Sequence, residues 1–153
     1  MATLPGVIEN IQATFSDTIA DNAAENQSIS FPDYWATAGV QKVRIHGVTG
    51  SFEAGDTASV MAFDILFWGT DGYNEATGAV EKLQGIVTFA AADIEKIGAE
   101  DVERFSKTFA EAPMFYEDQD LTSELHITLV NRAGGAFHAD DTLTLTFQLE
   151  AIE

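Results

Sequence analysis

The sequence contains no cysteine, which excludes disulfides, thiolate metal sites and a cysteine nucleophile. Basic residues are scarce: 7 lysines and arginines stand against 25 aspartates and glutamates, which gives a formal net charge of −18. Because nucleic acids and anionic membranes are bound through cations, this balance disfavours both as partners. No apolar run approaches the ~20 residues that span a bilayer. The N-terminus also lacks the basic start and the apolar block of a secretory signal.

What remains is a chain able to build a core, since hydrophobic residues make up 46% of it. We divide it into an N-terminal arm or helix, residues 1–35, and a main domain, residues 36–153. In the first part, apolar residues recur at the three- and four-residue steps of an amphipathic helix: Val7, Ile8, Ile11, Phe15 and Ile19. The segment "FPDYW" that follows gathers three aromatic residues around a proline, outside any clear periodicity.

From residue 36 onward the pattern changes to the period of two that half-buried strands show. Two late segments are the clearest, because leucines alternate with polar residues in "SELHITLV" and "DTLTLTFQLEAI". Residues 91–105 instead have helical spacing. We therefore expect a mainly β fold, a jelly-roll-like antiparallel β-sandwich with a short helical insertion and the N-terminal arm or helix.

One expected strand, residues 60–68, is apolar on both faces, as "VMAFDILFW" shows. In a two-sheet sandwich a strand has the core on one side only. Its second face therefore needs cover from another layer of the same chain, from a partner or from a ligand. We expect the helical insertion to cover part of it and an identical neighbouring subunit to cover the rest.

Motifs of known chemistry are missing. The sequence has no HExxH, no GxSxG, no phosphate loop and no GxGxxG. His46 and His126 fall on the polar side of their strands, so we expect both at the surface. We accordingly expect no enzyme, and no catalytic, cofactor-binding or metal-binding residues. Calcium binding by an acidic loop stays open as an alternative, although "YEDQDLTSE" is no EF-hand; it holds Glu117, Asp118, Asp120 and Glu124.

Trp68 and Tyr73 flank an acidic, hydroxyl-rich turn. Sugar-binding modules place aromatic rings beside acidic and amide groups, so a carbohydrate-binding or adhesin-like β-sandwich module is the alternative function. The competing interpretation, which we favour, is that Trp68 packs at the end of the core, as large aromatic residues usually do.

Three segments resemble a known family. "FDILFWGTDG" is similar to its apolar strand that runs into a polar turn, "FAAADIEKIG" to its short helix, and "ADDTLTLTFQLEAI" to its terminal strand. The family is the jelly-roll, trimer-forming capsid decoration (cement) proteins of tailed bacteriophages. The resemblance covers roughly residues 36–153. Residues 1–35 have no counterpart that we can place, and "AEDVERFSKTFAEAPMFY" is longer and more acidic than the family leads us to expect.

The resemblance implies a structural virion protein, made in the host cytoplasm, that binds the outer surface of a phage head. It implies a homotrimer that stabilises contacts between subunits of the major capsid protein, without catalysis or cofactor. Exposed aromatic residues would anchor such contacts. The candidate capsid or subunit contacts are Phe31, Pro32, Tyr34, Trp35, Trp68 and Tyr73.

Overall fold

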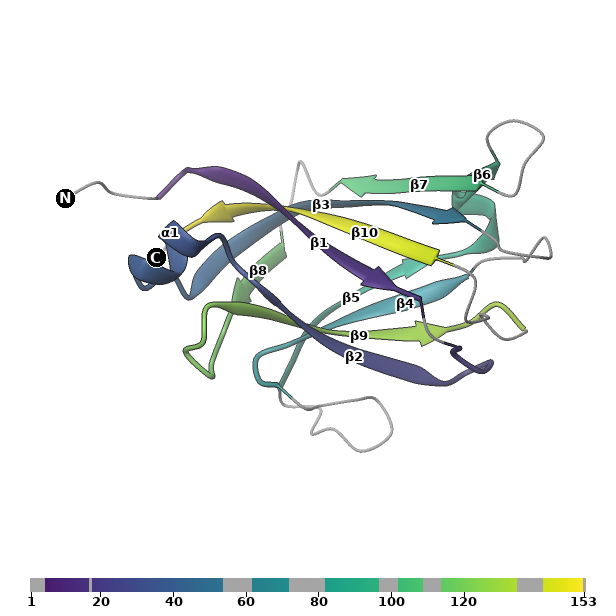
Figure 1. Ribbon diagram of the computed structural model, residues 1–153, viewed down its shortest axis with the longest axis horizontal. Coiled ribbons are helices and arrows are strands. Elements are labelled where there is room, and N and C mark those ends of the chain that lie inside the picture. The colour runs from purple at the N-terminus through teal and green to yellow at the C-terminus, as the bar shows by residue number, and fades with distance from the viewer. Residues whose placement is uncertain are drawn as a thin grey trace.

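The computed structural model describes residues 5–16, 18–53, 62–71, 82–96, 102–108, 114–134 and 142–152. Two antiparallel sheets face each other (Figure 1). The six-stranded sheet has the order β1-β10-β3-β7-β6, with β8 also paired to β3. Its strands are β1 (Ile8–Phe15), β10 (Thr142–Ala151), β3 (Lys42–Glu53), β7 (Val102–Thr108), β6 (Glu95–Lys96) and β8 (Met114–Glu117). No helix in the described part of the chain is long and apolar enough to cross a membrane.

The four-stranded sheet has the order β2-β9-β4-β5. Its strands are β2 (Ala24–Ser30), β9 (Glu124–Asn131), β4 (Phe63–Trp68) and β5 (Leu83–Phe89). In the six-stranded sheet, β7 and β8 pair with successive parts of β3, so they occupy one position beside it. Apart from the two-residue β6, which adds an edge position to the first sheet, the strands form two four-position sheets, β1-β10-β3-β7/β8 and β2-β9-β4-β5, in the order of a jelly roll. The predicted jelly-roll β-sandwich is confirmed.

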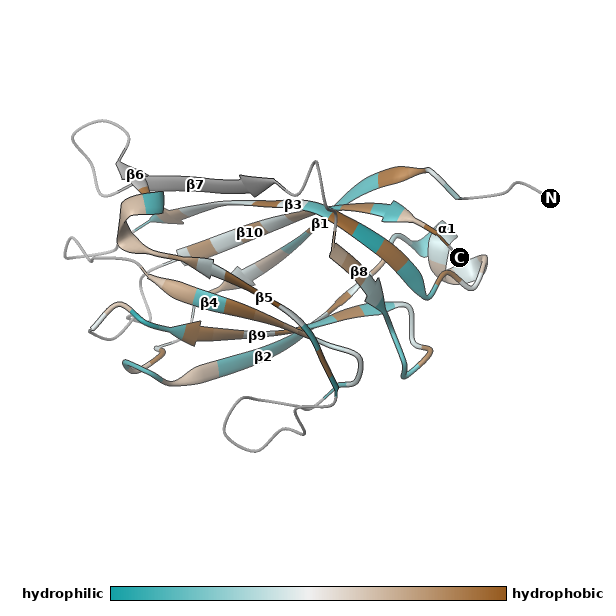
Figure 2. Ribbon diagram, turned by 180° about the vertical axis from the view of Figure 1, so that it is seen from behind, coloured by the Kyte–Doolittle hydropathy of each residue, from teal (hydrophilic) through white to brown (hydrophobic). Residues whose placement is uncertain are grey.

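The core lies between the sheets and follows the period of two. On β10, Leu143, Leu145, Phe147 and Leu149 are all buried while the residues between them are more exposed. Figure 2 shows the same alternation of hydrophobic and hydrophilic residues along the strands, with β2 mainly hydrophilic at the edge of its sheet.

The predicted N-terminal helix is wrong, because residues 8–15 form strand β1. β1 pairs along its whole length with residues 143–150 of β10 and buries Ile11, Ala13 and Phe15, whereas Ile8 stays 52% exposed. Ile11 and Phe15 are four residues apart, a spacing that fits both a helix and one face of a strand. Pairing with β10 decides between them. The first 35 residues thus contribute β1 to one sheet and β2 to the other.

The predicted helical insertion is also wrong. Residues 91–93 form one 3₁₀ turn, and β6 and β7 follow it as strands. The α-helix of the described residues is α1 (Asp33–Thr37), which is built from "FPDYW". Pro32 precedes it and accepts the N–H groups of Trp35 and Ala36, and Gly39, at φ +76°, ends it in the left-handed conformation.

Candidate functional site

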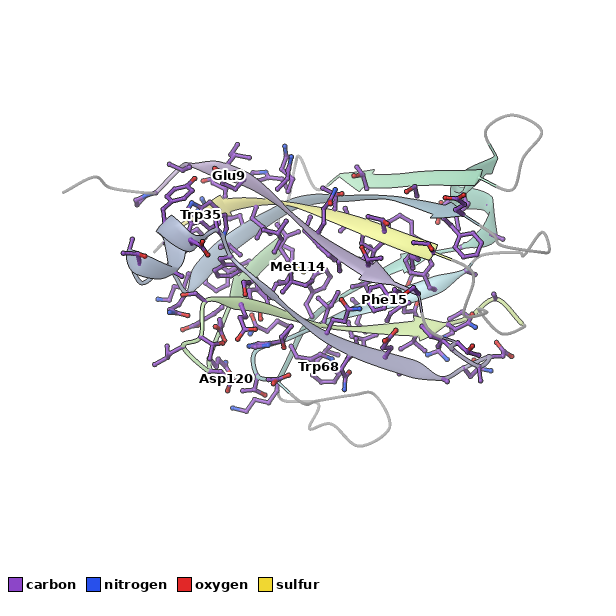
Figure 3. The ribbon with its side chains drawn as sticks, viewed as in Figure 1. Glu9, Phe15, Trp35, Trp68, Met114 and Asp120 are labelled. Carbon is purple, nitrogen blue, oxygen red and sulfur yellow. The ribbon has the colours of Figure 1, made fainter. Side chains whose placement is uncertain are left out.

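The outward face of β4 is buried although the sheet packs its other face against the core. Leu66 and Trp68 are only 6% and 3% exposed, and with Val130 and Leu83 they form a second apolar cluster apart from the main core. Figure 3 shows Trp68 on the side of the four-stranded sheet that faces away from the six-stranded sheet. One chain alone achieves this burial, so the expected cover by an identical neighbour is not needed.

Trp68 is fixed by its ring nitrogen, which donates a hydrogen bond of 2.8 Å to Thr128 Oγ1. A buried and hydrogen-bonded ring offers no flat surface on which a sugar could stack. The structure therefore favours the packing interpretation of Trp68 over the sugar-binding one. Tyr73 lies outside the described residues.

His126 lies on the same outer face and is only 2% exposed, so the prediction that it is a surface residue is wrong. The alternation placed it on the correct face, but that face is covered. Its Nε2 lies 3.0 Å from Asp118 Oδ1 and its Nδ1 lies 2.8 Å from Ser28 Oγ. The Ser28 hydroxyl in turn donates to Asp71 Oδ1 at 3.0 Å. The imidazole is thus held between a hydroxyl on one side and a carboxylate on the other.

This serine–histidine–aspartate line is not arranged for acyl transfer. In a hydrolase the histidine must take the serine proton, whereas here Ser28 directs that proton to Asp71. The Asp71 carboxylate would also oppose negative charge developing at a substrate oxygen beside Ser28. Asp120, whose Oδ2 is 3.7 Å from His126 Nε2, adds another negative charge. The geometry suits a buried hydrogen-bond network that holds the strands and the loop together.

Asp118 is fully buried and organises the loop between β8 and β9. Its two oxygens accept from the backbone N–H groups of Asp120, Thr122 and Glu124, at 2.9–3.1 Å. They also accept from the Thr122 hydroxyl and from His126. Burial alone would raise the pKa of Asp118, but the hydrogen bonds from Glu124 N–H, His126 and Thr122 outweigh it and lower that pKa.

One group of described residues could offer ligands to a metal ion: Asp118, Asp120 and His126. Their possible ligand atoms all lie within 4.8 Å of one another. A carboxylate has about four lone-pair positions, and Asp118 already accepts five hydrogen bonds. A cation would have to displace donors that hold the loop. The geometry therefore favours a structural brace over the calcium site left open by the sequence.

Tyr116 ties this brace to β4. Its hydroxyl donates to the carbonyl of Trp68 at 2.8 Å and accepts the backbone N–H of His126 at 3.0 Å. Desolvation raises the pKa of Tyr116 far above its ordinary range, so the hydroxyl keeps its proton for this bond. The sequence offered no signal for Tyr116, because its partners come from two other strands.

The remaining predicted contact residues lie around α1. Phe31 and Trp35 are buried, at 2% and 0% exposure, and pack edge to face with ring centroids 6.0 Å apart. Their rings belong to the core of this chain. Pro32 is half-buried, and Tyr34 is 45% exposed, with its hydroxyl bonded to Glu9 Oε1. Five of the six candidate contact residues are described by the structure. Among these five, Tyr34 and Pro32 have side-chain surface that a partner could reach.

The outward face of β1, β10 and β3 is hydroxyl- and amide-rich. Its described outward residues include Asn10, Gln12, Thr14, Thr49, Ser51, Thr142, Thr144, Thr146 and Gln148. We call this set the threonine face. At one end of it, Glu150 is held by His46 at 2.8 Å and Arg44 at 3.1 Å. The hydrogen bond from His46 and the charge of Arg44 lower the pKa of Glu150. The carboxylate of Glu150 is thus paired with Arg44 and His46.

Comparison with known proteins gives structural likeness only. No protein-family model matches the chain, and no curated protein matches it in sequence. A chain of tomato aspermy virus is similar over 95% of this chain and 79% of its own, at 4% identity and a TM-score of 0.46. A chain of the empty head of turnip yellow mosaic virus is similar over 100% and 86%, at 11% identity and a TM-score of 0.36. A chain of desmodium yellow mottle tymovirus is similar over 99% of this chain and 91% of its own, at 8% identity and a TM-score of 0.31. The jelly-roll assignment rests on the strand order of this chain itself.

Proposed function

We propose that this protein is a structural component of a virion, a decoration or cement protein. It binds the outside of a tailed-phage head and stabilises contacts between subunits of the major capsid protein. The observation that carries the proposal is the jelly-roll strand order, because this architecture is one that viral capsid domains use. It agrees with the resemblance of two sequence segments, those at β4 and β10, to the decoration family, whereas the third segment, likened to a short helix, forms a 3₁₀ turn and strand β6. In this role the protein is made in the host cytoplasm and needs neither catalysis nor a cofactor.

The threonine face is the surface that we propose for contact between copies, as a homotrimer. A chain with a net charge of −18 repels its own copies, so they must meet where carboxylates are few or paired. Most described outward residues of the threonine face are hydroxyls and amides. Glu150 at one end is paired with Arg44 and His46, and the exposed Glu53 lies at the other end, opposite Thr142. Threonine hydroxyls and amides can form hydrogen bonds across such an interface.

The carbohydrate-binding alternative has no specific support from the structure. Trp68, which suggested it, is buried and bonded to Thr128.

The test combines solution mass with shell binding. Light scattering at low and high salt should give a mass of three chains, at least at high salt, where repulsion between acidic copies is screened. Phage shells stripped of outer proteins should bind the chain and lose their contents at a higher temperature once it is bound. A monomer at both salts that also fails to bind shells would refute the proposal. A monomer in solution that trimerises on shells would support it.

A further inference from the structure

Leu121 is the most exposed of the large hydrophobic residues that the structure describes. It is 71% exposed, and its φ of +60° places it in the left-handed conformation. Non-glycine residues rarely adopt this conformation, and asparagine is favoured over leucine there. A leucine at this position gains little burial within its own chain and strains the backbone. Folding alone does not explain it.

The loop that carries Leu121, residues 118–123, is nevertheless firmly held. Asp118 anchors it through the bonds described above. Ser123 N–H donates to Gln41 Oε1 at 3.2 Å, and the Ser123 hydroxyl donates to Val40 O at 2.9 Å. Phe31 N–H donates to the Ser123 carbonyl at 2.9 Å, which ties the loop to the segment before α1. The leucine is therefore presented in a fixed position, and a rigid anchor loses little entropy on binding.

The charges around Leu121 specify the kind of partner. Asp120 is its neighbour in the chain, and Asp120 Oδ2 accepts the backbone N–H of Asp71, which brings the Asp71 backbone beside the loop. Figure 3 places Asp120 at the end of the sandwich that also holds Glu9 and Trp35. A lysine, Lys82, contacts the same loop, with its Nζ 3.4 Å from Gln119 Oε1. An apolar side chain among carboxylates matches an apolar pocket with a basic rim.

We propose that Leu121 is a docking anchor that inserts into an apolar pocket, rimmed by lysine or arginine, on a partner protein. A second copy of this acidic chain does not fit, because its charge has the same sign. The proposal deepens the proposed function and rests on it to this extent: the partner is then a subunit of the phage shell. Leu121 and the threonine face serve different contacts, one with the shell and one between copies.

The test replaces Leu121 with asparagine, which accepts the left-handed conformation and removes the apolar side chain. We expect L121N to bind stripped shells about 30-fold more weakly, the loss typical of a contact anchor. Its thermal midpoint should be unchanged or up to about 4 °C higher, because strain is relieved. The matched control is Ile86→Thr, which removes another exposed apolar side chain, 53% exposed, from the outer face of β5. I86T should bind shells like the wild type.

A photo-crosslinking residue at position 121, or at position 86 as control, separates this inference from the proposed function. The chain is exposed to lysate of the cells that naturally make it, and adducts are identified by mass spectrometry. A 121-specific adduct with the major capsid protein supports both. A 121-specific adduct with another protein, at a peptide with lysine or arginine beside apolar residues, supports the anchor and refutes the decoration role. The anchor is refuted if the crosslinker at position 121 yields no more adduct than the crosslinker at position 86, or if it yields only self-adducts. It is also refuted if the wild type binds shells and L121N binds them equally well.

Discussion

The substitution Asp118→Asn tests whether the buried carboxylate braces the sandwich. Asparagine has nearly the same shape but no charge, and its amide group replaces one acceptor oxygen with a donor. The NH₂ group faces hydrogen-bond donors at either oxygen position. At Oδ1 the donors are Asp120 N–H and His126, and at Oδ2 they are Thr122 and Glu124. Buried donors are then left without acceptors, and His126 loses its nearest negative charge.

The expected cost is large for a single substitution. Leaving a buried donor without its acceptor costs about 1–3 kcal/mol, and a hydrogen bond to a charged group contributes ~1.5–3 kcal/mol. These terms describe the same atoms and do not add. We therefore expect D118N to lower the free energy of unfolding by about 3 kcal/mol, or the midpoint by about 6–12 °C.

Thermal and urea unfolding of the wild type, D118N and the control D120N, at several pH values, give the answer. The folded pKa of Asp118 is below its unfolded value, which is about 3.9. Its stabilisation is therefore complete above about pH 4 and is lost as pH falls through the folded pKa. The difference between wild type and D118N should be largest near neutral pH and should shrink toward pH 3. The reasoning is refuted if D118N costs no more than D120N, or if its cost does not change with pH.

Three further predictions address packing and assembly. Gly85→Ala should cost about 1–2 kcal/mol, because its Cβ would lie 2.6 Å from Met114 Sδ; urea unfolding should show a smaller cost when Met114 is alanine. Thr146→Glu should reduce the mass measured by light scattering, at a salt concentration where the wild type has the mass of three chains, and leave the thermal midpoint nearly unchanged; an unaltered mass there would exclude the threonine face as the contact. Trp68→Phe should cost about 1 kcal/mol through loss of the bond to Thr128, and titration with sugars should show no response in either protein.

The strand that the sequence predicted best is β10, which has one buried face. In β10, leucines and a phenylalanine alternate with polar residues because the core lies on one side of the strand. This pattern needs only local sequence to be recognised. It also supplied the two-sheet architecture, since a chain of such strands must bury their apolar faces against each other.

The N-terminal strand was missed because its signal is ambiguous. Ile11 and Phe15 fit a helix and a strand equally, and the small Ala13 between them gives a weak apolar signal on the strand face. What decides is the ladder to β10, whose partner residues lie more than 100 positions away in the chain. Tertiary pairing thus overrode a local periodicity.

The centre of the brace was beyond local prediction for the same reason. His126 pairs with Ser28, which is 98 residues away, and with Asp118, which is only 8 residues away but across the turn between β8 and β9. The sequence correctly placed His126 on the face of its strand that points away from the core. It did not predict that this face is buried, because burial depends on what covers the sheet. The acidic segment around Asp118 was noticed as a possible calcium loop. Only the hydrogen-bond count shows that its carboxylate is already occupied.

Because the second face of β4 is closed within one chain, partner contacts have to use other surfaces, and the two proposed here should respond to salt in opposite ways. Copies that meet through the threonine face must overcome repulsion between two charges of −18, so screening strengthens their association. A shell pocket with a basic rim instead attracts the acidic surroundings of Leu121, so screening weakens that contact and slows its formation. Solution mass and shell affinity measured over one salt series should therefore diverge. If both fell together, the assignment of separate surfaces to copies and to the shell would be wrong.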